Sequence, residues 1–156
     1  MKLEIYQDTP HDRDLIARYP LKDPTFTATP QQALAIAMGD PERLPILVIA
    51  GSEMVGFFVL TKHDDVREVG ANPATALLIR SLSVSETQRG KGIATQMLEQ
   101  LPAFVREHFP FATTITLAVE AANVPAQKLY DKVGFVDTSR RRFGQYGEQY
   151  ILEKTL

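Results

Sequence analysis

One segment near the middle of the chain, residues 76–97, constrains the fold more than any other part of the sequence. Residues 76–84 form a largely apolar run of the length of a buried strand. A short polar turn with two glycines follows. From Ile93 onward, apolar residues recur at intervals of three and four, as they do along one face of a helix. The segment therefore predicts a buried strand that turns sharply into a helix.

The turn between this strand and this helix, Arg89-Gly90-Lys91-Gly92, is suited to binding an anion. Gly90 and Gly92 have no Cβ, so the backbone can turn sharply there. The first N–H groups of the helix have no partner within the helix, and the helix dipole places partial positive charge at that end. Arg89 and Lys91 add two full positive charges. Together these features predict a site for a phosphate-bearing anion.

Several kinds of glycine-rich turn compete as explanations of this pattern. A Walker-type loop needs a lysine directly before Ser or Thr, but Lys91 precedes Gly92. A dinucleotide-binding turn needs a third glycine, where this chain has Thr95, and an acidic residue about twenty positions on. The acid of the next strand, Glu120, comes too late for that role. An ordinary strand-to-helix turn, with glycines for geometry alone, is a further alternative.

The remaining pattern is Arg-x-x-Gly-x-Ala, formed here by Arg89, Gly92 and Ala94 after the strand. It resembles the acyl-coenzyme A binding segment of the GNAT N-acetyltransferases. The family's second signature, Asn-x-x-Ala-x-x-Leu-Tyr-x-x-x-Gly-Phe, also occurs downstream in this chain. Its matching residues are Asn123, Ala126, Leu129, Tyr130, Gly134 and Phe135. Because the two signatures are independent and each falls on the expected kind of element, the chain is identified as resembling this family.

Composition places limits on the class of protein. The 156 residues suffice for one domain with a hydrophobic core, and we expect that domain to span residues 1–156. Apolar residues make up 44% and charged residues 23%, as in ordinary globular proteins. No apolar run is long enough to span a bilayer, and the acidic residues near the amino terminus do not fit a signal peptide. We therefore expect a cytoplasmic protein without a membrane partner.

The residue types also argue against several kinds of site. The chain has no cysteine, which excludes disulfides, thiol catalysis and cysteine metal sites. Its three histidines are scattered, with no pair at the helical spacing of metal ligands, so we expect no metal. A formal net charge of −2 argues against broad nucleic-acid binding.

Local patterns predict a fold of the α/β (α+β) class, with a mixed central sheet of about six to seven strands flanked by about four helices. Residues 62–75 are expected to form a loop or hairpin tip, and Pro102 to bend or interrupt its helix near Leu98. The resemblance adds a V-shaped splay between the central strands of the GNAT fold. Strands are predicted at 2–7, 44–50, 54–61, 76–84, 114–119, 135–142 and 147–154, and helices at 9–20, 29–39, 93–110 and 123–134.

The resemblance implies acetyl-CoA as the cosubstrate. In the family, the backbone of the central strand binds the pantetheine arm, which corresponds here to Leu82, Ser83 and Val84. A backbone N–H near Leu82 is then placed to stabilise the oxyanion of the tetrahedral intermediate. The pyrophosphate is expected on the turn and the start of the helix, at Arg89, Gly90, Lys91, Gly92, Ile93, Ala94 and Thr95.

Two further residues receive roles from the second signature. Tyr130 occupies the family's general-acid position, from which a phenol donates a proton to the departing thiolate. Taken alone, Tyr130 is better explained as a half-buried aromatic residue of the core, and the surrounding signature reverses that preference. Asn123 is expected to contact the cofactor while capping its helix, and the sequence also allows capping alone.

The base that deprotonates the acceptor stays open. Glu120 is the best acidic candidate, although a solvated carboxylate at a strand end is the more usual interpretation of such a residue. His63 is the other candidate, but it lies in a charged loop, where solvation is more common. Deprotonation through water, with no single base, is equally admissible.

The resemblance implies an N-acetyltransferase that transfers the acetyl group of acetyl-CoA to a primary amine of a small molecule or peptide. The absence of cysteine favours direct attack within a ternary complex. The alternative is a non-catalytic acyl-CoA sensor. Dimerisation, common in this fold, stays open, as does the identity of the amine.

Acceptor specificity is expected in loops 20–30, 61–75 and 143–147, with Tyr19, Phe26 and Tyr146 as candidate contacts. Arg140, Arg141 and Arg142 are interpreted as a solvated or dimer-edge face, with an anionic acceptor as the minority reading.

Overall fold

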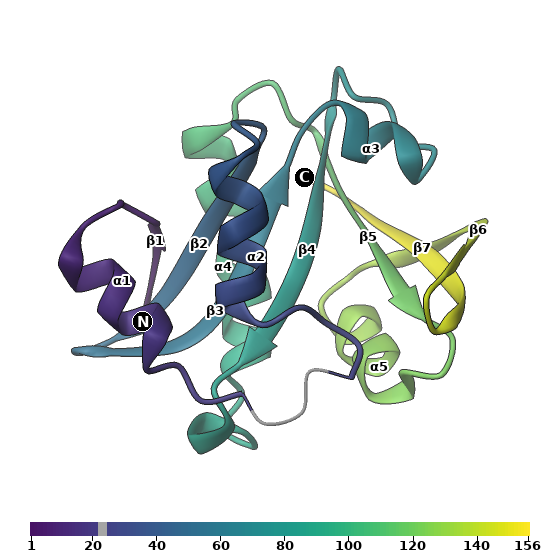
Figure 1. Ribbon diagram of the computed structural model, residues 1–156. Coiled ribbons are helices and arrows are strands. Elements are labelled where there is room, and N and C mark those ends of the chain that lie inside the picture. Colours follow the sequence, from purple (N-terminus) through teal and green to yellow (C-terminus); the bar gives the residue numbers. More distant parts are fainter. Residues whose placement is uncertain (22–24) are drawn as a thin grey trace.

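A seven-stranded mixed sheet organises the molecule (Figure 1). The structure is a computed structural model that describes residues 1–21 and 25–156, so residues 22–24 of the expected acceptor loop lie outside it. The strand order is β1-β2-β3-β4-β5-β7-β6, and β4 and β5 are the parallel pair among antiparallel neighbours. The strands are β1 (Lys2–Ile5), β2 (Arg43–Ala50), β3 (Glu53–Thr61), β4 (Ala76–Val84), β5 (Thr114–Glu120), β6 (Val136–Gly144) and β7 (Gly147–Thr155).

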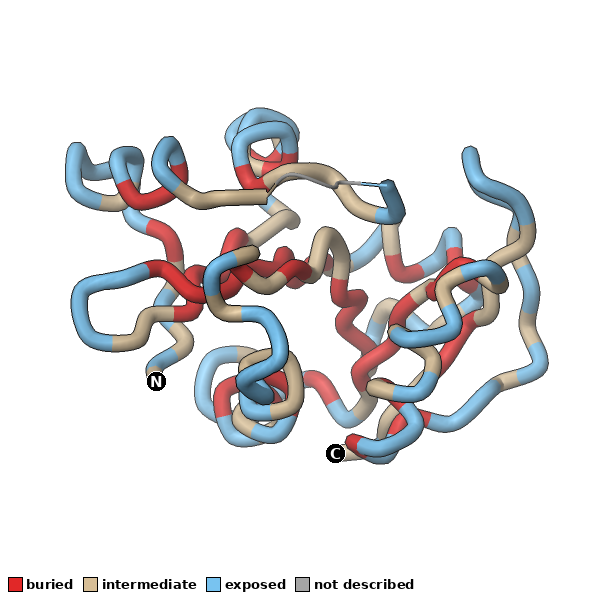
Figure 2. The backbone as a smooth tube through the Cα atoms, turned by 90° about the horizontal axis from the view of Figure 1, so that it is seen from below, coloured by how far each residue is buried: buried red, intermediate tan, exposed pale blue. Residues whose placement is uncertain are grey.

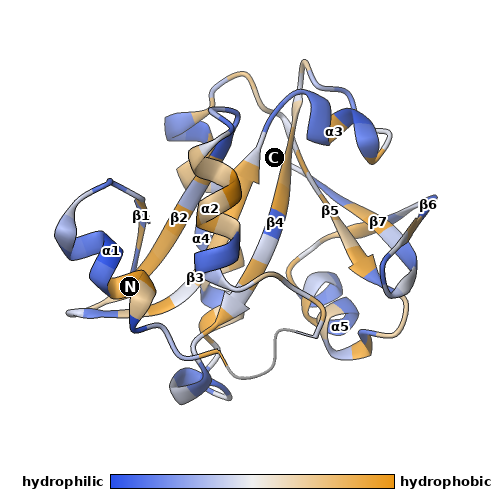
Figure 3. Cartoon of the chain, viewed as in Figure 1, coloured by the Kyte–Doolittle hydropathy of each residue, from blue (hydrophilic) through white to orange (hydrophobic). Residues whose placement is uncertain are grey.

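Helices cover both faces of this sheet, so that the buried residues form a middle layer (Figure 2). On one face, Phe57 and Val59 of β3 pack beneath α1 (Pro10–Ala17) and α2 (Pro30–Met38). On the other face, Phe58 and Leu60 pack against the longest helix, α4 (Ile93–His108), whose cluster also includes side chains of α5 (Val124–Lys132). The alternation follows from the two-residue repeat of a strand. Because both faces are covered, the central strands are mostly hydrophobic (Figure 3).

The predicted helix starts are confirmed in detail. The Thr9 side chain accepts a hydrogen bond from Asp12 N at the start of α1. At α2, Thr29 and Gln32 form a reciprocal capping box, and Gly39 follows the last turn. These contacts satisfy backbone donors that a helix leaves unpaired at its first turn.

One expectation about local structure is wrong, and one of two alternatives for another is excluded. Residues 62–75 contain a short helix, α3 (Asp64–Glu68), whose Val66 is fully buried against β4 and β7. The helix containing Pro102 is not interrupted, because α4 runs from Ile93 to His108 with Pro102 in its interior. Packing of the buried apolar face of α4 offsets the loss of one backbone hydrogen bond, a cost of about 3 kcal/mol. A one-turn 3₁₀ helix, η1 (Glu86–Gln88), also precedes the glycine turn.

The predicted splay between the central strands is present. β4 and β5 are paired only from Ala76 with Thr114 to Ile79 with Leu117. Beyond these pairs β5 continues beside β7, while β4 stays beside β3 (Figure 1). The second half of β4 is therefore open on the side that β5 leaves.

A β-bulge interrupts β4 where the splay begins. Arg80 is opposite Val59 and Ser83 is opposite Phe57, so Ser81 and Leu82 share one partner position on β3. Ser81 has φ 55°, a left-handed conformation that is uncommon outside glycine. An extra residue shifts the in–out alternation of a strand. As a result Leu82 packs with the α4 face, whereas Ser83 contacts Tyr19 on the α1 face.

Among the described residues, no helix is long and apolar enough to cross a membrane. Nor does any group of three or more His, Asp or Glu side chains in that part of the chain have an arrangement that holds a metal ion.

Candidate active site

A cavity of about 760 Å³ opens where β4 and β5 separate. Its wall runs from the glycine turn at the start of α4, along residues 82–84 of β4, to the end of β5 and the inner side of α5. The splay thus brings together the two sequence signatures, which are distant along the chain.

The glycine turn presents backbone donors to this cavity. Gly90 and Gly92 have φ values of 76° and 75°, which explains why residues without a Cβ are needed there. Gly92 is the N-cap residue of α4, and no side chain caps the helix. A Cβ added at either glycine would meet no atom within 4 Å, so the space beside the turn is open. The amides at this end can therefore bind a phosphate, as a free helix N-terminus does.

The predicted turn residues are not equivalent. Residues 92–95 line the cavity together with Arg89 and Gly90. Lys91 lies outside the wall and donates a hydrogen bond from Nζ to Gln88 Oε1 at 3.4 Å. The residues present accordingly fit the pyrophosphate of a coenzyme A derivative through amide donors and one guanidinium, with Lys91 at the surface.

Residues 82–84 of β4 form the floor of the cavity. None of the described strands pairs with them on the side that β5 leaves, so their backbone groups are available to a ligand. The side chain of Ser83 is engaged elsewhere, since its Oγ is 3.0 Å from the Tyr19 hydroxyl. Tyr19 itself is outside the cavity wall and packs with the core beneath α1 and α2.

Tyr130 lies in the cavity wall on α5 and is only 9% exposed. Its ring packs edge-on against Phe135, with 5.7 Å between the centroids. Burial raises the pKa of the phenol to about 12, so the hydroxyl stays protonated at neutral pH. That hydroxyl makes no hydrogen bond to any described residue. The side chain thus belongs to the core and also offers a proton donor to the cavity.

Asn123 combines two functions in the same way. Its Oδ1 accepts a hydrogen bond from Ala126 N at 3.3 Å and caps α5. It also lines the cavity, so capping does not remove it from the site.

Glu120 is not the solvated strand-end acid that was expected. It is 7% exposed and lies in the cavity wall. Gln149, its partner on β7, donates from Nε2 to Glu120 Oε1 at 2.7 Å. The other oxygen, Oε2, is buried and has no hydrogen-bond partner in the part of the chain that the structure describes. β7 pairs with β5 as far as Glu120, the last residue of β5. This pairing, which the local sequence does not reveal, buries the Glu120 carboxylate.

The other candidate base, His63, lies apart from the site. It is exposed at the start of α3 and lines neither cavity of the described chain.

A second, smaller cavity of about 220 Å³ adjoins the first on the α3 face of the sheet. The two cavities share Phe26, Arg80 and Gln149 among their lining residues. Phe26 packs edge-on against Tyr146 of the β6–β7 turn, with 6.1 Å between the ring centroids. The chain before α2 therefore contacts the β6–β7 hairpin beside the cleft.

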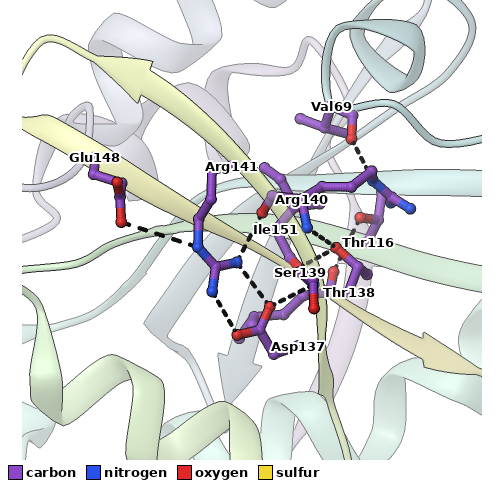
Figure 4. Close-up of polar contacts among 10 residues, drawn as sticks. Val69, Thr116, Asp137, Thr138, Ser139, Arg140, Arg141, Glu148 and Ile151 are labelled. Atoms are coloured by element: carbon purple, nitrogen blue, oxygen red, sulfur yellow. Dashed lines mark hydrogen bonds and ion pairs between the residues drawn. The ribbon is translucent and has the colours of Figure 1, made fainter.

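The three consecutive arginines of β6 point to different partners. Arg140 donates from Nε to Val69 O at 3.0 Å, and Arg141 binds both carboxylate oxygens of Asp137 (Figure 4). Arg141 also stacks on the ring of Tyr150. Arg142 lines the smaller cavity. A solvated face therefore describes Arg141, whereas Arg142 joins the site together with Arg80 and Gln149. The run of three arginines, for which an anionic acceptor was the less favoured interpretation, was a local signal for this group.

Comparison with known proteins agrees with this arrangement. The sequence model of the acetyltransferase (GNAT) family matches residues 4–135. A protein of Bacillus subtilis (strain 168) named uncharacterized N-acetyltransferase YbbJ is 40% identical over 134 residues, which cover 86% of this chain and 84% of that protein.

Solved structures share the fold at low sequence identity. The aminoglycoside acetyltransferase AAC(6')-Ib, in complex with paromomycin and acetyl-CoA, has a TM-score of 0.76 at 18% identity, covering 99% of this chain and 94% of that one. A chimera of spermidine N-acetyltransferase SpeG from Vibrio cholerae and hSSAT has a TM-score of 0.70 at 14% identity, with coverages of 99% and 96%.

Proposed function

The chain belongs to the GNAT acetyltransferase family and is an N-acetyltransferase, and from this premise we propose that it acetylates a primary amine of a small molecule or peptide by direct attack on acetyl-CoA. The observation that supports this most is the single cavity that joins the uncapped start of α4 to Tyr130 through the splayed strands. We take residues 1–156 as one catalytic domain, because β6 and β7 complete the sheet that the matched region begins. A cytoplasmic location stays a prediction.

The cofactor side of the proposed site uses mainly backbone groups. The amides of residues 92–95, assisted by Arg89, hold the pyrophosphate. The open edge at residues 82–84 hydrogen-bonds the pantetheine arm as a neighbouring strand would. Asn123 lies beside the same arm.

The transfer step then needs three groups around the thioester. The Leu82 N–H stabilises the negative charge that develops on the thioester oxygen. As the C–N bond forms and the C–S bond breaks, Tyr130 donates its phenolic proton to the departing thiolate, and the phenolate regains a proton from the newly acylated nitrogen. Glu120 Oε2 accepts a proton from the acceptor's ammonium, either directly or through water, because this buried oxygen has no donor among the described residues.

The experiment that tests this function compares Tyr130→Phe with wild type for thiol release from acetyl-CoA, across a panel of amines. We expect kcat to fall by about 10²-fold or more, because an acid that acts in the transition state is removed, while acetyl-CoA affinity stays unchanged. Tyr6→Phe is the matched control, since Tyr6 is equally buried at 9% exposure and lies outside the cavity.

Two results would contradict the proposal. If acetyl-CoA binds but no amine accelerates thiol release, the chain is an acyl-CoA sensor. If Tyr130→Phe and Tyr6→Phe lose equal activity, the phenol has no specific part in the reaction.

A further inference from the structure

We propose that the acceptor is a small amine that also carries a carboxylate, and that Arg80 and Arg142 bind this carboxylate in the smaller cavity. The inference rests on the proposed function, because it concerns the second substrate of the same cleft.

The size and place of the smaller cavity limit its occupant. Its volume of about 220 Å³ lies below the roughly 300–1,000 Å³ of sites for drug-sized ligands. Its wall shares Arg80, Ser81 and Gln149 with the larger cavity, so a molecule held there lies next to the proposed transfer site. An occupant of the size of an amino acid fits these limits better than an oligosaccharide does.

The charges in its wall are of one sign. Arg80 and Arg142 line the cavity, and no Asp or Glu does so in the described chain. Both guanidiniums have acidic neighbours behind them, but the ion pairs are long: 3.6 Å from Arg80 to Asp65 and 3.5 Å from Arg142 to Glu68. Charge-assisted hydrogen bonds are typically about 2.7–2.9 Å. Since a guanidinium has several N–H donors, both side chains retain donors for a ligand carboxylate.

Arg80 in particular is under-compensated. The carboxylate nearest to it, Asp65, is closer to Arg43, at 3.1 Å, although Arg43 also has Asp40 as a partner at 3.4 Å. Burial, and next the positive charge of Arg43, lower the pKa of Arg80 from its usual value. Both effects act against the charged form, and an anion in the cavity would relieve both.

The opposite charge lies in the wall of the larger cavity. Glu120 Oε2 is buried without a hydrogen-bond donor among the described residues, which suits an ammonium group. Gln149 bonds the other Glu120 oxygen and lines both cavities, so it connects the two poles. A molecule with an amine at one end and a carboxylate at the other satisfies both. A polyamine satisfies only one and places further ammonium groups beside two guanidiniums.

The test uses the full chain with acetyl-CoA and matched acceptors. For each common amino acid, kcat/KM is measured for the free acid and for its amide, with O-phosphoethanolamine and spermidine added to the panel. We expect the best free acid to exceed its amide by at least about tenfold. We expect this preference for the free acid even though the amine of an amino-acid amide loses its proton more readily, which by itself favours the amide.

Variants then locate the recognition. Arg142→Gln should abolish the preference mainly through KM, and Arg142→Glu should reverse it in favour of the amide. Arg142→Lys, which keeps the charge without the planar fork, should keep part of it. Arg141→Gln is the control, because the neighbouring Arg141 is held by Asp137 and lies outside the cavity. Thermal unfolding checks that each variant is folded.

The outcomes separate this inference from the proposed function. If amides or spermidine are acetylated as well as the free acids, or Arg142→Glu changes no preference, the inference is wrong while the acetyltransferase proposal stands. A preference for O-phosphoethanolamine over every carboxylate also overturns it. If no amine accelerates thiol release, both proposals fail together.

Discussion

The two sides of the cleft are built from different chemical groups. On the α4 and α5 side, the proposed cofactor contacts are mainly backbone groups of the glycine turn and of the open edge of β4. On the α3 side, the contacts are side chains: Arg80 from β4, Arg142 from β6 and Gln149 from β7. One side therefore depends on how the backbone is shaped, and the other on which residues the backbone carries.

This difference indicates which changes each side tolerates. Backbone donors survive most substitutions, provided that φ and the helix start are kept. Side-chain contacts change with a single substitution and leave the sheet intact. The α3 side is accordingly where acceptor choice can vary without loss of cofactor binding, and each prediction below tests whether the two sides are separable in this way.

Glu120→Gln should separate the two sides most, because it should change acceptor kcat/KM strongly and acetyl-CoA affinity little. The amide keeps an oxygen for the Gln149 hydrogen bond but cannot accept the proton of an ammonium. We expect kcat/KM for the acceptor to fall by about 10²-fold or more, with acetyl-CoA affinity within about twofold of wild type. Steady-state kinetics and calorimetry measure the two quantities.

Glu148→Gln is the control for this change, because Glu148 lies on the neighbouring strand β7 beside Gln149, pairs loosely with Arg141 at 3.9 Å and is outside both cavities. A parallel loss of acetyl-CoA affinity in Glu120→Gln would show that the sides are not separable.

The next effect concerns one buried tyrosine on each face of the sheet, of which only Tyr130 lines the cleft. Burial raises the pKa of both Tyr19 and Tyr130 to about 12, so the folded protein holds their protons to higher pH than the unfolded chain does. Their stabilising contribution is complete below pH 10 and is lost as the pH rises to about 12. It amounts to about 2–3 kcal/mol for each residue.

Urea unfolding at pH 9, 10 and 11 measures this loss. Tyr19→Phe and Tyr130→Phe should each reduce it, and the double variant should reduce it additively because the residues lie on opposite faces. If only one variant alters the pH dependence, the other phenol is solvated in solution.

Gly92→Ala should give the smallest effect, confined to the cofactor side. An L-residue at φ 75° costs about 1–2 kcal/mol of stability. The added methyl group also occupies the open space where the anion approaches, so we expect acetyl-CoA affinity to fall by about tenfold and acceptor KM to stay unchanged.

Gly51→Ala is a close control for this substitution. Gly51 has φ 64°, also has no atom within 4 Å of an added Cβ, and lies in the β2–β3 hairpin away from both cavities. It should lose similar stability and no affinity. If Gly92→Ala and Gly51→Ala bind acetyl-CoA with equal affinity, the turn at Gly92 does not hold the pyrophosphate.

The same contrast explains what the sequence could predict. The cofactor side depends on contiguous residues, such as Gly92 at a helix start and Asn123 seven residues before Tyr130, so local patterns identified the elements that carry it. Helix caps at Thr9 and Thr29 were likewise readable because a cap and its partner are three residues apart.

The acceptor side was harder because its residues meet only through tertiary structure. Arg142 contacts Glu68 across a long separation in sequence, and Glu120 is buried by pairing with Gln149 of a later strand. The short helix α3 was missed because its charged residues resemble a loop, and only the packing of Val66 against β4 and β7 distinguishes it.

The β4 bulge has a genetic consequence. Because Ser81 and Leu82 occupy one position opposite Phe58, the strand carries one residue more than its neighbour requires. Loss of a single codon here would remove the bulge. Every side chain of β4 on one side of the deletion would then point to the opposite face of the sheet. An in-frame deletion at this point should thus be far more harmful than a missense change at either codon, since it would disturb the lining of both cavities at once.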